Sequence, residues 1–82
     1  MSLELYQEVA LMRDLPEHQL QAGDVATLID FVTHPEAGEA GCVLEVFNAI
    51  GESIAVIAVP QSTVEVLRSD EILTVRSFPK AS

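Results

Sequence analysis

The 82-residue chain has room for one hydrophobic core, so we expect a single domain over residues 1–82 with its core between about 8 and 76. Thirteen acidic residues against four Lys and Arg give a net charge of −9. This charge argues against nucleic acids and anionic membranes as partners, because both repel an acidic surface. It favours a basic protein partner instead.

Short runs of β-branched and aliphatic residues, separated by Gly, Pro and Asn, predict an all-β chain. A first strand over 8–12 runs into a long loop at Pro16, which has no N–H for a sheet ladder. A turn at Gly23 and Asp24 leads into a second strand, 25–32. Side-chain alternation then places three large residues of that strand on one face, Val25, Ile29 and Phe31.

Residues 33–41 are polar and rich in Gly, which predicts a flexible hairpin tip before a third strand at 42–47. Asn48 and Gly51 are preferred at the two ends of a type I turn. A tight hairpin into a fourth strand, 53–59, is therefore expected.

A short 3₁₀ turn is expected next, because Ser62 and Glu65 have the spacing of a capping box. The last strand is predicted at 72–76, where apolar side chains alternate. Five short strands favour a small five-stranded SH3-like barrel, since closure removes unpaired edges. We expect seven residues to supply much of the core: Val25, Ile29, Phe31, Leu44, Val46, Val56 and Leu67.

Several stretches resemble a bacterial family of unknown function, number four-nine-two-six among such domains. They read RDLPEHQLQAGDV at 13–25, LEVF at 44–47 with GES at 51–53, VP at 59–60 and DEIL at 70–73. The resemblance implies an SH3-like barrel and no catalytic residues. The element at 23–27 is also similar to the turn and strand of KOW modules in ribosomal and transcription proteins. Ala26 stands where that pattern has a second Gly, which argues against close approach to RNA.

The sequence contains few residues in a pattern that suits a catalytic site. His18 beside Asp14 and Glu17 has the composition of a general base or a metal ligand, but a solvated loop histidine is the commoner case. His34 precedes a proline in the predicted tip, and Glu36 and Glu39 lack calcium-loop spacing. We therefore expect no enzyme activity, no metal and no cofactor.

The single cysteine, Cys42, lies among apolar residues and has no second cysteine to pair with. Such a setting is typical of a buried thiol in a reducing compartment, so a cytoplasmic location is expected. The N-terminus lacks the features of a signal peptide, and no apolar run is long enough to span a membrane.

The predicted strand at 53–59 is apolar on both faces, although a small barrel should expose alternate residues. Its outer face would be covered either by the chain itself, through the segment 3–6 or the 3₁₀ turn, or by another subunit. The candidate interaction surface combines this face with the loop around His18: Ile54, Val56, Ala58, Asp14, Glu17 and His18.

The leading functional hypothesis is a non-enzymatic protein-interaction module that self-associates, as a homodimer in the simplest case, or binds a basic protein partner. Self-association should weaken as salt is lowered, because the like charges are then less screened. The alternative is a KOW-like nucleic-acid or ribosome-associated factor, which the net charge of −9 opposes.

Overall fold

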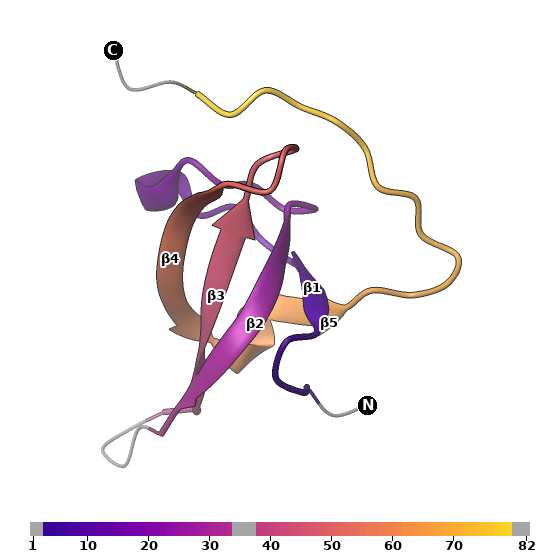
Figure 1. Ribbon diagram of the computed structural model, residues 1–82. Helices are drawn as coiled ribbons and strands as arrows, with labels where there is room; N and C mark the ends of the chain where they lie inside the picture. The colour runs from indigo at the N-terminus through magenta and orange to yellow at the C-terminus, as the bar shows by residue number, and fades with distance from the viewer. Residues whose placement is uncertain (1–2, 34–37, 80–82) are drawn as a thin grey trace.

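The computed structural model describes residues 3–33 and 38–79, and Figure 1 shows its strands arranged as one curled layer. The five strands are β1 (Glu8–Leu11), β2 (Val25–Val32), β3 (Gly41–Phe47), β4 (Ser53–Pro60) and β5 (Val64–Val66). Two 3₁₀ helices, η1 (Pro16–His18) and η2 (Gln61–Thr63), lie in the connections. The predicted all-β class and the short 3₁₀ turn before the last strand are thus confirmed. Within the described ranges no helix is long and apolar enough to cross a membrane.

The strands pair antiparallel in the order β4-β3-β2-β1-β5. The two edge strands, β4 and β5, are joined directly by η2. The sheet therefore curls so that the end of β4 lies close to the start of β5 (Figure 1). In the described residues β4 and β5 form no ladder with each other, so the closed barrel that we predicted is an open, curled sheet. The reason is that β5 has only three residues, and all three pair with β1.

The last strand lies earlier than predicted. Residues 72–76 have the alternation of a strand but pair with no described residue, and the sheet ends with β5 at Val64–Val66. Leu11 of β1 pairs with Val64, which places the segment after η2 directly beside β1. The prediction of a strand at 72–76 is therefore wrong for the isolated chain.

The register of β2 is opposite to the predicted one over its first half. Val9 of β1 pairs with Ala26, so Ala26 and Leu28 point into the core and Val25 points out. A β-bulge between Leu28 and Asp30 leaves Ile29 without a partner in β3. Beyond the bulge Phe31 lies at the open end of the sheet, where 40% of it is exposed. None of the three residues predicted for this strand's core face is buried.

Among the other predicted core residues, Leu44 and Val46 are buried, which confirms them, and Leu67 is only half-buried. Val56 is exposed because β3 pairs Glu45 with Val56 and Leu44 with Ile57, so Ile57 takes the inner position. The core consists of Val9, Leu11, Leu15, Leu20, Ala26, Leu28, Cys42, Leu44, Val46, Ile57, Val59 and Val64.

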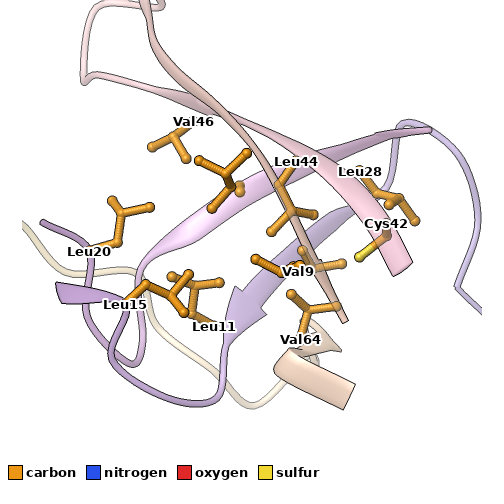
Figure 2. Packing of buried hydrophobic residues seen from close by; sticks show 12 residues of the cluster. Val9, Leu11, Leu15, Leu20, Leu28, Cys42, Leu44, Val46 and Val64 are labelled. Carbon is orange, nitrogen blue, oxygen red and sulfur yellow. The ribbon is translucent and has the colours of Figure 1, made fainter. Parts of the chain in front are cut away.

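The loop before β2 closes one end of this core. Leu15 and Leu20 flank η1 and exchange backbone hydrogen bonds, 2.8 Å and 3.1 Å long. Figure 2 shows both side chains directed toward Leu11 and Val46. Gln19 takes the left-handed conformation, φ 59°, that ends η1 and turns the chain back.

Two turn predictions have different outcomes. The hairpin turn is confirmed, because the N–H of Gly51 donates to the carbonyl of Asn48 over 3.0 Å and Gly51 has φ +87°. The capping box is not formed. Ser62 instead bonds Glu39, with its N–H and hydroxyl each 2.9 Å from a carboxylate oxygen, and Glu65 lies in β5. The centre of the predicted flexible tip, with His34 and Glu36, lies outside the described residues.

Candidate protein-interaction surface

The outer face of β3 and β4 is apolar and open to solvent. The register pairs Val43 with Ala58 on this face, and Val56, two residues before Ala58 in β4, lies on the same face. Val56 is 58% exposed, which is unusual for a β-branched side chain in a sheet. We call the following five residues the outer patch: Val43, Phe47, Ile54, Val56 and Ala58.

Carboxylates lie directly beside the outer patch. The pairings Glu8 with Thr27, Thr27 with Glu45, and Glu45 with Val56 put these residues in one row across four strands. Neighbours in such a row have Cβ atoms about 5 Å apart. A second row begins with Asp30, which pairs with Val43. No ion pair joins these three carboxylates to a cation in the described part of the chain.

The N-terminal segment does not cover the outer patch. The N–H of Tyr6 donates to the carbonyl of Leu28, and the N–H of Leu28 donates to the carbonyl of Gln7 over 2.9 Å. These bonds place the segment along β2, and Leu3 packs against the core. Cover by residues 3–6, part of one of the two predicted arrangements, is therefore absent from the described structure.

In the second half of the predicted surface, around η1, the described side chains form no hydrogen-bonded cluster. His18 ends η1 and is half-buried, while Asp14 and Glu17 are exposed. No side-chain hydrogen bond or ion pair joins His18 to either carboxylate in the described residues. Asp14 instead accepts the N–H of Ala22 at 2.9 Å. Its carboxylate therefore fixes the loop before β2 rather than orienting an imidazole.

Cys42 is fully buried on the inner face of β3, between Leu28 and Leu44 in the core, as the sequence predicted (Figure 2). Burial raises the pKa of its thiol, because the thiolate would lose its hydration there. A protonated, inaccessible thiol is a poor nucleophile and a poor metal ligand. In the described ranges no group of His, Cys, Asp and Glu is arranged to hold a metal ion.

A shallow depression of about 710 Å³ lies at the open end of the sheet. Its apolar wall includes Leu3, Phe31 and Val64, and its polar rim includes Arg68 and the bonded pair of Ser62 and Glu39. The serine hydroxyl donates to the carboxylate, and no histidine of the described ranges lines the depression.

An ion pair that the sequence did not indicate joins the start of β2 to the C-terminal segment. Arg76 donates from Nε to Asp24 at 2.8 Å and from Nη2 to the other carboxylate oxygen, while the N–H of Gln21 also donates to Asp24. Partial burial raises the pKa of Asp24, but the hydrogen bonds from Arg76 and Gln21 outweigh it and the pKa lies below its ordinary value. The partners are 52 positions apart, so only the fold could reveal the pair.

Comparison with known proteins gives a family without an assigned activity. The model of the family described as Domain of unknown function (DUF4926) matches residues 5–66. This match covers every strand from β1 to β5 and stops before the C-terminal segment 67–79. No curated protein and no solved structure matches the chain.

Proposed function

The chain belongs to the DUF4926 family, a domain of unknown function, and we propose that it is a non-enzymatic module that binds a basic protein partner. The docking surface is the outer patch with its flanking carboxylates. One observation carries the proposal: Val56, 58% exposed, lies directly across from Glu45, which has no described cationic partner. An apolar surface beside unpaired carboxylates fits a segment in which apolar and basic residues alternate.

Two forces would act on such a partner. The net charge of −9 attracts a basic chain over distances near the Debye length of about 8 Å, which raises the association rate. Burial of apolar area then contributes about 25 cal/mol per Å², which slows dissociation. An interface of ordinary size takes about 800 Å² from each partner, more than the outer patch alone supplies, so Glu8, Asp30 and Glu45 would lie inside it or at its rim.

The direct test is a titration of the ¹⁵N-labelled protein with a ten-residue peptide in which Leu and Lys alternate. We expect amide shift changes concentrated at Val43, Glu45, Val56 and Ala58, with none at His18. A peptide in which Leu and Glu alternate is the control. Shifts confined to the loop around η1, or no shifts with either peptide, would contradict the proposal.

A matched pair of variants separates local recognition from general attraction. Glu45→Gln and Glu17→Gln each raise the net charge by one, but only Glu45 lies beside the outer patch. We expect Glu45→Gln to weaken peptide binding about fivefold and Glu17→Gln to leave it almost unchanged, because a contact in a desolvated interface is worth more than one in solvent. Equal losses would mean that the peptide responds to net charge alone.

The KOW-like alternative is tested by filter binding with structured RNA over a range of salt concentrations. At physiological salt we expect no retention, because a chain of charge −9 releases too few counterions on binding phosphates. Ala26, at the position where KOW modules have Gly, is 4% exposed and packs in the core. We also propose a cytoplasmic location, which suits the reduced, buried Cys42.

A further inference from the structure

The C-terminal segment is an extended chain with unusual exposure. After β5 the described residues 67–79 form no strand, and Figure 1 shows them arching away from β5 and then turning back above the sheet. Ile72 is 87% exposed, Leu73 62% and Val75 95%. We call residues 72–75 the arch. Three large apolar side chains in four consecutive residues lie in water, although the sequence there has the alternation of a strand.

The arch follows β5 and a turn closed by local bonds, and contacts with the rest of the fold come after it. Before it, Arg68 bonds Asp70 at 3.0 Å, and the N–H of Arg68 donates to the Glu71 carboxylate at 2.6 Å. After it, Arg76 bonds Asp24 and Phe78 packs against the core. Because β5 precedes the arch and Arg76 and Phe78 are held after it, the segment loses less conformational entropy when it pairs with another strand than a free tail would lose.

The C-terminal segment differs in charge from the rest of the chain. All thirteen acidic residues lie within 1–71, where the net charge is −11, while 72–82 contains Arg76 and Lys80 and no acid. The arch and the residues after it therefore combine apolar and basic side chains. This is the chemistry that suits the outer patch and its carboxylates.

The sheet offers a strand edge of the right kind. β4 pairs only with β3, and its other edge makes no backbone hydrogen bond with any described residue. An unpaired edge of eight residues with an apolar face is a template for strand addition. β5, the other edge strand, has only three residues and offers a much shorter ladder.

We propose that the arch adds as a strand to the free edge of β4 in a second copy of this chain, and that two copies exchange arches reciprocally. The added strand continues the outer patch of the other copy, while Arg76 keeps its ion pair with Asp24 of its own chain. Two-fold exchange satisfies both free β4 edges and closes the assembly at two subunits. The inference rests on the proposed function, because it names the arch of another copy as the segment that binds beside the outer patch.

Sedimentation velocity on the full chain at physiological salt tests the exchange. We expect a dimer at about 50 μM, and monomers for either Val75→Lys in the arch or Val56→Lys on β4, because each places a charge in the contact. Mixing the two variants should restore a dimer, because the intact arch of one chain can still add to the intact β4 of the other. Ile50→Lys is the control: Ile50 is 80% exposed in the turn before β4 and the variant should dimerise normally.

A second experiment measures the binding of a peptide of residues 72–80 to each variant. The peptide should bind the Val75→Lys chain, whose β4 edge is intact, and should not bind the Val56→Lys chain; a scrambled peptide should bind neither. A wild-type chain that stays monomeric at all concentrations would overturn the exchange. So would a dimer that survives Val75→Lys.

The outcomes also separate this inference from the proposed function. A monomeric chain that binds the Leu–Lys peptide on the outer patch supports the proposed function and overturns the exchange. A dimer that depends on Val75, formed by a chain that ignores the Leu–Lys peptide, supports the exchange and overturns recognition of a general basic partner. Circular dichroism of each variant confirms that the fold is retained, which we expect because Val56 and Val75 are both largely exposed.

Discussion

Ile57 and Val56 are consecutive in β4 and similarly apolar, yet Ile57 is 5% exposed and Val56 is 58% exposed. The inner face of β4 packs against Leu44 and Cys42, while the outer face meets solvent beside Glu45. The inner face therefore contributes to folding, and the outer face remains free to contribute to association. Hydrophobicity alone does not distinguish the two faces. The register with β3 does, and substitutions on each face should act on different properties of the protein.

The largest effect is expected in the centre of the inner face. Leu44 has no exposed surface, so Leu44→Ala removes buried methyl groups and leaves a cavity. We expect a loss of about 2 to 5 kcal/mol in the free energy of unfolding, measured by urea denaturation. A chain of 82 residues has a total stability of roughly 4 to 12 kcal/mol, so this variant is close to unfolding. A loss below about 0.5 kcal/mol would mean that β3 is in a different register.

An intermediate effect is expected at the open end of the sheet. If Phe31 were fully buried, Phe31→Ala would cost about 3 to 5 kcal/mol. Because 40% of Phe31 is exposed beside the depression, we expect about half of that cost. Urea denaturation of Phe31→Ala and Leu44→Ala under the same conditions gives the comparison. A loss larger than that of Leu44→Ala would show that Phe31 is buried in the folded chain.

A smaller, pH-dependent effect is expected where the C-terminal segment is anchored. The pKa of Asp24 is lowered in the folded state, so its contribution to stability is complete above the pKa of the unfolded chain and is lost as the pH falls through the folded value. Arg76→Gln should therefore lower the urea midpoint at pH 7, and the difference from wild type should shrink below about pH 4. The same difference at pH 7 and pH 3 would exclude the ion pair as its cause.

The smallest effect on folding is expected on the outer face. Val56→Ala removes two methyl groups that are already largely in water, so the free energy of unfolding should change by less than about 0.5 kcal/mol. The measurement is again a urea melt, carried out at a protein concentration low enough to keep the chain monomeric. A loss comparable to that of Leu44→Ala would show that the outer face is covered in the folded chain.

Local sequence signals predicted some elements well and others poorly. Asn48 and Gly51 specify their turn through their own conformational preferences, and Cys42, Leu44 and Val46 are buried in a strand whose side chains alternate regularly. Alternation could not give the register of β2, because the bulge at Ile29 reverses the face of the residues that follow it. Bulges depend on the partner strand rather than on the strand's own residues.

Most of the wrong sequence predictions concern residues whose structure depends on contacts between distant parts of the chain. Ser62 has the spacing to Glu65 of a capping box, but the fold brings Glu39 to it instead. The strand pattern at 72–76 is genuine in the sequence, but it has no partner in the single chain. Of the candidate surface, the β4 residues were identified from their two-faced pattern. Val43, Phe47 and Glu45 were not predicted as part of it, because only the pairing of β3 with β4 places them beside the β4 residues.

The most direct test of the difference between the two faces is calorimetric titration of Val56→Lys with the Leu–Lys peptide, alongside Glu17→Gln, which changes the net charge by the same amount. The substitution lies on the exposed side of β4, so the fold should be retained. We expect affinity for the peptide to fall at least about tenfold in Val56→Lys, equivalent to about 1.4 kcal/mol, and to stay near wild type in Glu17→Gln. A folded Val56→Lys protein with wild-type affinity would contradict the assignment of the outer face as the docking surface.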